Sequence, residues 1–267
     1  AVKNNEGEWV LLNGNQTALM FVYYLITRWK ELGKINGKEY IVKTIVTTET
    51  IKTIAERNGV EMYDVYTGFK WIANVMRENE GKKNYIGGGE ESYGFLCEDF
   101  VRDKDAVSAC VILAEIAAWA KDQGLSLYQL LQKIYVEYGF SKEKGISVVK
   151  KGKSGAEEIE AMMKKFRENP LTEIAGSKVT YFYDYSTLKG KDYAENETVT
   201  LDMPTTSNVL QYFTEDNTKV SIRPSGTEPK IKFYMEVQGE MGCRNCFASA
   251  DAAAMEKIEA VKKSLGI

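Results

Sequence analysis

The chain has 267 residues, of which 44% are hydrophobic and 27% are charged, and its formal net charge is −3. This composition is typical of a globular protein with one or two domains, and the balanced charge argues against a general nucleic-acid-binding surface. The chain contains no histidine, which excludes Ser-His-Asp and Cys-His catalysis and histidine-based metal sites within this sequence. No apolar run reaches the length of a membrane span and no signal peptide opens the chain, so we expect a cytoplasmic protein.

The chain begins at Ala1 without a methionine, and "AVKNNEGEWV" is typical of a strand and hairpin. We therefore expect a piece of a longer protein, with removal of an initiator methionine as the alternative explanation of the first residue. The following elements alternate between helix and strand, which predicts a mainly parallel sheet with helices on both faces. The predicted strands cover 40–48, 60–66 and 83–89, and the predicted helices cover 15–34, 49–59, 69–81, 105–124 and 126–139. Because the helix over 105–124 is apolar nearly all round, we expect it to be buried.

A capping box of Ser154 and Glu157 predicts that the next helix begins there and ends at Pro170, and 171–177 resembles a linker. Beyond residue 170 short strands follow one another without helices between them, and a final helix covers 248–265. We therefore expect two domains. Residues 1–170 would form an α/β domain, and residues 171–267 would form a smaller α+β domain with a largely antiparallel sheet.

The loop "RPSGTEPK" combines groups that bind anions. Arg223 offers a planar fork of donors that matches a phosphate, and Ser225 and Thr227 add hydroxyl donors. Gly226 allows the backbone N–H groups to turn inward, and Lys230 adds positive charge at the rim. This composition predicts a loop that holds a phosphate without reacting with it. The alternative is an ordinary hairpin, since Pro-Ser-Gly is common in turns.

Two earlier stretches have polar groups beside glycines. In "YIGGGEESYGF" the spacing of a nucleotide-binding loop is absent, and Glu90 would repel a phosphate but accept hydrogen bonds from sugar hydroxyls, with Ser92 beside it. The alternative is a solvated acidic turn. In "YTGFKWI", Thr67 and Gly68 stand at a strand-to-helix junction, where Thr67 could cap the helix. Lys70 in the first helical turn would suit an incoming anion, or could simply face solvent.

The cysteines of "CRNC", Cys243 and Cys246, have the spacing of a redox pair. No thioredoxin-like βαβ unit precedes them, and a zinc site would need two further ligands. We expect reduced thiols in a loop, with a redox pair as the alternative.

The motifs "VYTGFKWIA", "GGGEESYGF", "VRDKDAVSA" and "RPSGTEPKIKFY" occur in this order and together resemble the second half of the α-D-phosphohexomutases, the phosphoglucomutase/phosphomannomutase group. The resemblance covers essentially the whole chain. It implies that Glu90 and Ser92 bind sugar hydroxyls and that Thr67, Gly68 and Lys70 line the cleft near the reacting end, with Lys70 as an acid/base. The distal phosphate would be held by Arg223, Ser225, Gly226 and Thr227, with Lys230 at the rim. Asp103 or Asp105 would start the helix that follows.

The resemblance also implies what this sequence lacks. The phosphorylated serine of the family, in its Thr-Ala-Ser-His-Asn-Pro setting, and the Asp-x-Asp-x-Asp-Arg loop that binds Mg²⁺ are not found. We expect the N-terminal half of the same enzyme to supply both, and this chain to be inactive by itself. The implied substrates are glucose or mannose 1- and 6-phosphates. A non-catalytic sugar-phosphate-binding module and a mutase for amino-sugar phosphates remain alternatives.

Overall fold

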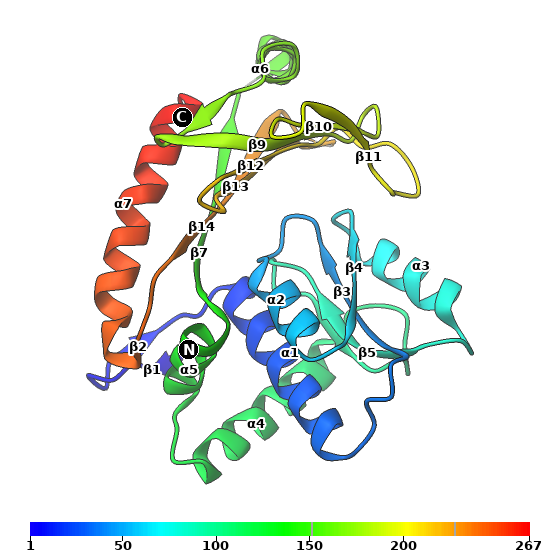
Figure 1. Cartoon of the computed structure of the whole chain (residues 1–267), viewed down its shortest axis with the longest axis vertical. Coiled ribbons are helices and arrows are strands. Elements are labelled where there is room, and N and C mark those ends of the chain that lie inside the picture. Colours follow the sequence, from blue (N-terminus) through cyan, green and yellow to red (C-terminus); the bar gives the residue numbers. More distant parts are fainter. Residues whose placement is uncertain (151, 227) are drawn as a thin grey trace. The chain divides into compact units, whose positions relative to one another are not determined.

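The computed structural model in Figure 1 describes residues 1–150, 152–226 and 228–267, with the backbone alone at residue 153. The chain forms two compact units. The first unit combines Ala1–Phe140 with Met241–Phe247, and the second combines Ser141–Glu240 with Ala248–Ile267. Within the described ranges, no helix has the length and apolarity needed to span a lipid bilayer.

The division between the units falls earlier in the chain than the expected domain boundary near residue 170. Strand β7 (Phe140–Val149) pairs with β14 (Lys230–Gly239), and helix α6 (Gly152–Glu168) packs on β14 and on β13 (Lys219–Pro224). Residues 141–170 therefore belong to the second unit. Their sequence alone did not reveal this, because the partner strand lies about 90 residues away in the chain, beyond the reach of local patterns.

The first unit alternates strands and helices, as expected. It opens with a short hairpin of β1 and β2, whose register pairs Val2 with Val10. The elements of this unit are β1 (Val2–Lys3), β2 (Trp9–Val10), α1 (Gly14–Glu31), β3 (Glu39–Thr44), α2 (Thr50–Arg57), β4 (Glu61–Val65), α3 (Phe69–Asn79), β5 (Asn84–Gly89), β6 (Phe95–Cys97), α4 (Ala106–Asp122), α5 (Leu127–Tyr138) and the 3-10 helix η1 (Arg244–Cys246).

The four-stranded sheet of this unit has the order β4-β3-β5-β6. Strand β3 runs parallel to both β4 and β5, whereas β6 runs antiparallel to β5. One face of the sheet packs on α3 through a buried cluster. The other face packs on α1, so closely that a Cβ added at Gly87 would lie 3.0 Å from the side chain of Leu25. The cluster on the α3 side consists of Tyr40, Val42, Val65, Phe69, Ile72, Met76, Tyr85 and Leu96.

Helix α4 corrects one expectation. Its N-cap is Asp105, whose carboxylate accepts hydrogen bonds from the backbone of Val107 and Ser108. The helix is not buried all round, because only Ile116 and Ala120 are fully buried while Val107 and Val111 are 74% and 61% exposed. Within the unit it contacts β6, α1 and α5. An apolar composition indicates that a helix can be buried, but the neighbouring elements decide which faces are covered.

The second unit contains a sheet with the order β11-β10-β9-β12-β13-β14-β7, with β8 paired to β9. The pairings of β8 to β13 with one another, and of β13 with β14, are antiparallel, as expected. Besides β7, α6, β13 and β14, the elements of this unit are β8 (Glu173–Ile174), β9 (Ser177–Asp184), β10 (Lys189–Asp192), β11 (Glu197–Thr200), β12 (Leu210–Thr214) and α7 (Phe247–Leu265).

The expected inward faces of the second unit are confirmed. The apolar side of β14 is buried, from Ile231 to Val237, and Phe233 meets the ring of Phe166 from α6 at 6.2 Å. In α7 the side chains of Ile258, Val261 and Leu265 are buried as well. Helices α6 and α7 therefore supply apolar side chains to the core of this unit.

Three local expectations in the second part of the chain are wrong. Helix α6 begins at Gly152 and not at Ser154, because the glycine adopts a φ of +74° that sets the entry of the chain into the helix. Residues 171–177 are not a plain linker, since β8 and β9 form a hairpin whose turn places Ala175 and Gly176 at positive φ. Cys243 and Cys246 are not reduced thiols in a loop, because η1 brings their Cα atoms to 5.3 Å and they form a disulfide.

Candidate functional site

The predicted sugar-binding residues lie at one edge of the first sheet. Because β3, β4 and β5 run parallel, their carboxyl ends share one edge, and β4 and β5 flank β3. Thr67, Gly68 and Lys70 follow β4, and Glu90 and Ser92 follow β5. In open α/β sheets the carboxyl ends of the strands are where ligands bind, so the topology brings these two distant stretches to the place where a site is expected.

A hydrogen bond joins the two stretches directly. The backbone N–H of Gly68 donates to Oε1 of Glu90 at 2.7 Å, and Glu90 is only 9% exposed. Gly68, and not Thr67, is the N-cap of α3, and its φ of +115° suits a residue without Cβ. A carboxylate at a helix N-terminus is stabilised by the helix dipole and by unpaired N–H groups. Glu90 is therefore a buried carboxylate that holds the start of α3 through Oε1.

The loop of Glu90 is held tightly by neighbouring backbone. The N–H of Glu90 donates to the carbonyl of Gly94 at 2.7 Å, and Thr44 donates to the carboxylate of Glu91 at 3.3 Å. A Cβ at Gly14, in the first turn of α1, would lie 1.9 Å from the carbonyl oxygen of Glu91. The loop therefore rests directly on the start of α1, and Ser92 is exposed at its tip.

The glycines that precede Glu90 are explained by close packing. A Cβ at Gly88 would lie 2.3 Å from the carbonyl oxygen of Val42, and one at Gly89 would lie 2.6 Å from the carbonyl oxygen of Gly94. These glycines therefore permit close packing within the sheet.

Lys70 faces a cationic hollow in the first unit. The hollow has a volume of about 580 Å³. Its lining contains four cations, Lys70, Arg77, Arg102 and Lys104, against the single carboxylate of Asp103. Arg102 pairs with Glu80 at 3.2 Å, and Lys104 donates to Asp103 at 3.2 Å, which lowers the pKa of the Asp103 carboxyl. The remaining lining residues are Phe69, Ala73 and Asn74.

The sequence indicated only Lys70 among these cations. Lys104 also reaches the acidic loop, because a Cβ at Gly94 would meet the Lys104 side chain at 3.0 Å and Oε2 of Glu90 at 3.1 Å. Arg77 and Arg102 come from α3 and from the segment before α4, so no short motif contains both. Arg77 follows Lys70 by seven residues, which is two helical turns, and this spacing on one face of α3 is the signal that could have indicated it.

The predicted phosphate loop is the hairpin between β13 and β14. The N–H of Ser225 donates to the carbonyl of Lys230 at 2.8 Å, and the N–H of Lys230 donates to the carbonyl of Glu228 at 2.7 Å. The Lys230 ammonium forms an ion pair with the Glu228 carboxylate, which lowers the pKa of that carboxyl. Lys230 is therefore partly neutralised at the rim. Thr227, which the sequence also indicated, lies outside the described residues.

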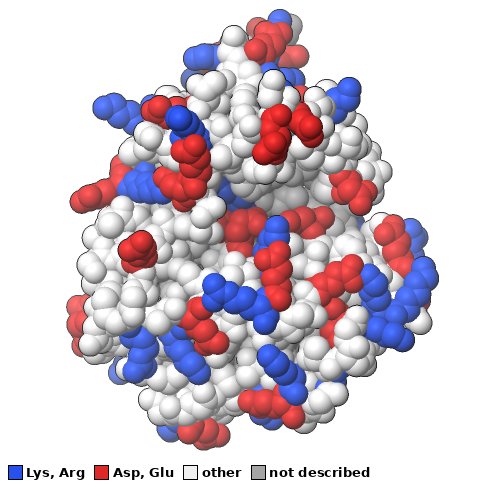
Figure 2. All heavy atoms as spheres, viewed as in Figure 1, with Lys and Arg blue, Asp and Glu red and all other residues white. Residues whose placement is uncertain are grey.

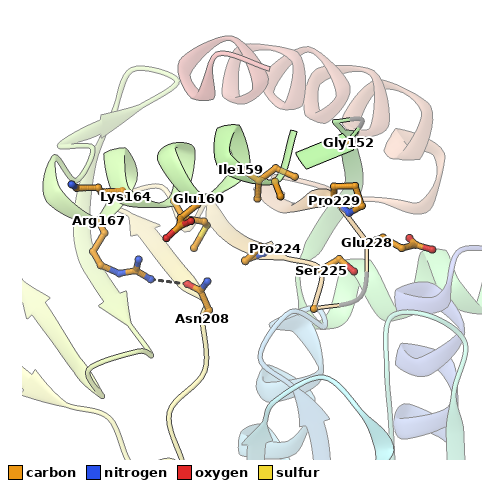
Figure 3. A pocket seen from close by; sticks show the side chains of 13 residues that line it. Gly152, Ile159, Glu160, Lys164, Arg167, Asn208, Pro224, Ser225, Glu228 and Pro229 are labelled. Carbon is orange, nitrogen blue, oxygen red and sulfur yellow. Dashed lines mark hydrogen bonds between the residues drawn. The ribbon is translucent and has the colours of Figure 1, made fainter. Parts of the chain in front are cut away.

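The loop has two different sides. Pro224, Ser225 and Gly226 line a hollow of about 740 Å³ beneath α6, and Glu228 and Pro229 join them (Figure 3). Across the hollow, Arg167 donates to Asn208 at 2.8 Å and to Asp184 at 2.9 Å. Arg223 does not line this hollow, and its cross-strand neighbour is Lys232 of β14. The alternation of β13 places Arg223 on the opposite face from Pro224, which lines the hollow. The α6 residues of the lining are Gly152, Ala156, Ile159, Glu160, Met163, Lys164 and Arg167.

Acidic and basic side chains are interspersed on the face of the molecule in Figure 2, without a broad area of one sign. Among the described residues, no group of three or more Cys, Asp or Glu side chains is arranged to hold a metal ion.

Comparison with known proteins follows the division seen in the structure. The family model for "Phosphoglucomutase/phosphomannomutase, alpha/beta/alpha domain III" matches residues 13–138, and the model for "Phosphoglucomutase/phosphomannomutase, C-terminal domain" matches residues 147–253. The chain belongs to the phosphoglucomutase/phosphomannomutase family. The family resemblance and the fold class expected from the sequence are thereby confirmed.

Curated relatives in this family include a phosphoglucomutase of Staphylococcus aureus (strain MRSA252), which is 36% identical over 238 residues. A phosphoglucomutase of Staphylococcus haemolyticus is 33% identical over 235 residues. The matches cover 89% and 88% of this chain, but the chain spans only 42% of the length of either relative.

Solved structures of the phosphoglucomutase/phosphomannomutase family share the fold. The open form of parafusin, a phosphoglucomutase from Paramecium, matches 96% of this chain and 43% of its own with a TM-score of 0.56 and 16% identity. A family protein from Burkholderia thailandensis matches 99% of this chain and 44% of its own, also with a TM-score of 0.56 and 16% identity. At this identity the likeness concerns the fold alone.

Proposed function

We propose that this chain supplies the sugar- and phosphate-binding part of a phosphohexomutase. The complete enzyme would interconvert hexose 1-phosphate and hexose 6-phosphate through an enzyme phosphoserine and a bisphosphorylated sugar. The observation that carries the proposal is the contact of Gly68 with Glu90. It joins two family-like stretches into one site beside a cationic hollow.

Each part of this proposed site has a distinct task. The free lone pairs of Glu90, with the exposed hydroxyl of Ser92, accept and donate hydrogen bonds to sugar hydroxyls. Lys70 at the start of α3, with the other cations of the hollow, stabilises negative charge near the reacting end and can donate a proton there. The loop of Arg223, Ser225 and Gly226, with Thr227, holds the phosphate that is not transferred.

The phosphoryl-donating serine and the Mg²⁺ site belong, in this proposal, to a part of the protein outside these 267 residues. The described residues do not fit a bound metal ion, since they present no suitable cluster of ligands. We therefore assign the chain positioning and charge stabilisation, which are the main contributions that a protein makes to phosphoryl transfer. The N-terminal part would be its partner, and the complete enzyme would act on glucose phosphates, the sugar in the relatives' names.

Calorimetric titration of this chain with glucose 1-phosphate and glucose 1,6-bisphosphate tests the binding role. Arg223→Ala is expected to weaken binding roughly 10- to 150-fold, because a hydrogen bond to a charged group contributes about 1.5–3 kcal/mol. Lys178→Ala, an exposed lysine of β9, is the matched control and should leave the affinity unchanged. Equal affinities of wild type and Arg223→Ala would contradict the role of the loop.

Activity measurements test the proposal that the phosphoryl-donating serine lies outside this chain. The chain by itself should show no turnover of glucose 1-phosphate, whereas a longer protein that contains it should convert glucose 1-phosphate faster than mannose 1-phosphate or glucosamine 1-phosphate. Turnover by the chain alone would refute the proposed location of the nucleophile. A longer protein that binds these sugars without converting them would instead indicate a non-catalytic binding module.

A further inference from the structure

The pair Cys243–Cys246 has no part in the proposed sugar-phosphate chemistry. The two sulfurs form a disulfide across two intervening residues, Arg244 and Asn245, directly before the first residue of α7. Cys243 is exposed to solvent, and Cys246 is half-buried. A bridge at such a position can be either a structural cross-link or a reactive group.

The local packing argues against a structural role. The stabilising effect of a disulfide grows with the length of the loop that it closes. Here the two cysteines are only 3 positions apart in the sequence, so the loop is very short. The same turn is already closed by a backbone hydrogen bond of 3.0 Å from Cys246 N–H to the Cys243 carbonyl. The turn therefore has little to gain in stability from the bridge.

The residues on both sides of the bridge are anchored independently. Met241 is 7% exposed, and the ring of Phe247 packs on Tyr128 at 5.5 Å and on Phe140 at 5.9 Å. These contacts lie within the first compact unit. Its segment Met241–Phe247 stands in the sequence between two segments of the second unit, Ser141–Glu240 and Ala248–Ile267. Opening the disulfide would thus leave the anchors in place and change only the turn between them.

The position favours thiol chemistry. Both sulfurs precede the N-terminus of α7, a helix of 19 residues, whose dipole stabilises a thiolate. Arg244 adds a positive charge inside the motif. Because the thiolate is the reactive form, its stabilisation makes Cys-x-x-Cys pairs at helix N-termini reactive in disulfide exchange.

The other two cysteines provide a contrast within the same chain. Cys97 is buried, which raises the pKa of its thiol and makes it unreactive, and Cys110 is an exposed thiol of α4 without a disulfide partner. Exposed unpaired thiols are typical of proteins in reducing compartments, where the disulfides that do form are usually transient or redox-sensing.

We propose that Cys243 and Cys246 form a redox-active pair that exchanges reversibly with a low-molecular-weight thiol of the glutathione class. A glutathione thiolate attacks the exposed sulfur of Cys243, and the sulfur–sulfur bond breaks with Cys246 leaving as a thiolate that takes up a proton. A second glutathione thiolate attacks the mixed disulfide on Cys243 and releases oxidised glutathione. The protein disulfide gains two electrons and two protons, and two thiols are oxidised to one disulfide.

Equilibration of the native chain in glutathione buffers of graded reduced-to-oxidised ratio tests this proposal. After acid quenching and alkylation, mass spectrometry of the peptide containing residues 243–246 measures the fraction of the dithiol. Both sulfurs should change together over millimolar glutathione without denaturant, while the exposed Cys110 forms at most a mixed disulfide with one glutathione and Cys97 stays protected. Hydrogen exchange should quicken at residues 244–249 on reduction and not in the rest of α7.

Single-cysteine variants test the order of attack. With oxidised glutathione, Cys246→Ser should accumulate a mixed disulfide at Cys243 several-fold faster than Cys243→Ser accumulates one at Cys246, because only Cys243 is exposed. A bridge that resists every buffer until the chain is denatured would show a structural cross-link and overturn the proposal. A pair that remains a dithiol even in oxidised glutathione would overturn it equally. Neither result depends on sugar-phosphate binding, so the two proposals fail separately.

Discussion

The backbone N–H of Gly68 donates a 2.7 Å hydrogen bond to the carboxylate of Glu90, 22 residues further along the chain. The contact joins the end of β4 to the end of β5 and places a buried carboxylate at the start of α3. The same hydrogen bond therefore stabilises the loop that follows β5 and fixes the position of Glu90 in the candidate site.

Replacing Glu90 is expected to destabilise the fold as well as the site. Glu90→Ala removes the acceptor of the half-buried Gly68 N–H and should cost about 1–3 kcal/mol in the free energy of unfolding, since that donor is left unsatisfied. Glu90→Gln retains an acceptor and should cost less. Urea unfolding measures both, with Ser92→Ala at the exposed tip of the same loop as a control that should change little. A Glu90→Ala protein as stable as Ser92→Ala would show that the contact contributes nothing.

Gly14→Ala distinguishes helix propensity from tertiary packing. Propensity alone predicts a gain of about 1 kcal/mol for alanine inside a helix. The Cβ would however lie 1.9 Å from the Glu91 carbonyl oxygen, so we expect a net loss of about 1–3 kcal/mol from overpacking. Thermal unfolding of this variant should be compared with Gly145→Ala in β7, where a Cβ meets nothing within 4 Å. A stabilised Gly14→Ala protein would contradict the close approach of loop and helix.

Asp216 makes the second unit sensitive to acid. Burial raises the pKa of its carboxyl, but hydrogen bonds from Lys257, Thr214 and Thr218 outweigh burial and hold the pKa well below the ordinary value of 3.8. Because the folded pKa is the lower one, the stabilisation is present above about pH 4 and is lost as the pH falls further, when the unfolded chain binds the proton more readily.

The free energy of unfolding of Asp216→Asn should accordingly lie below that of the wild type at pH 7, with the difference shrinking toward pH 3. Unfolding in guanidinium chloride at both pH values measures this, and Asp202→Asn, an exposed aspartate of the same unit, serves as the control. A difference that does not depend on pH would contradict the assignment.

Helix α4 offers a direct test of which faces are covered in this chain. Val111→Asp should change the free energy of unfolding by no more than about 0.5 kcal/mol, because this side chain is 61% exposed. Ile116→Asp, at a fully buried position of the same helix, should cost about 4 kcal/mol or more through an unpaired buried charge. Equal losses for the two variants in urea unfolding would contradict the exposure of the outer face.

The sequence carried enough local information for most elements. Alternation and helical spacing predicted α1, α3 and α7 close to their observed bounds, and Gly33, with φ at +65°, follows the C-cap of the first helix. Asp105 was recognised as a possible helix start because N-cap chemistry is local. The short motifs around Gly68, Glu90 and Arg223 were sufficient to indicate the family, since each lies within a few consecutive residues.

Only the tertiary structure decided which of these residues meet and which faces are covered. The pairing of β7 with β14, the convergence of Lys70, Arg77 and Lys104 on one hollow, and the exposure of α4 all depend on residues far apart in the chain. An arginine or lysine on an amphipathic helix has the same local pattern whether it faces solvent or a ligand. Local propensity and capping arise from neighbouring residues and can be read from the sequence, whereas burial and electrostatic convergence arise from the packing of distant segments.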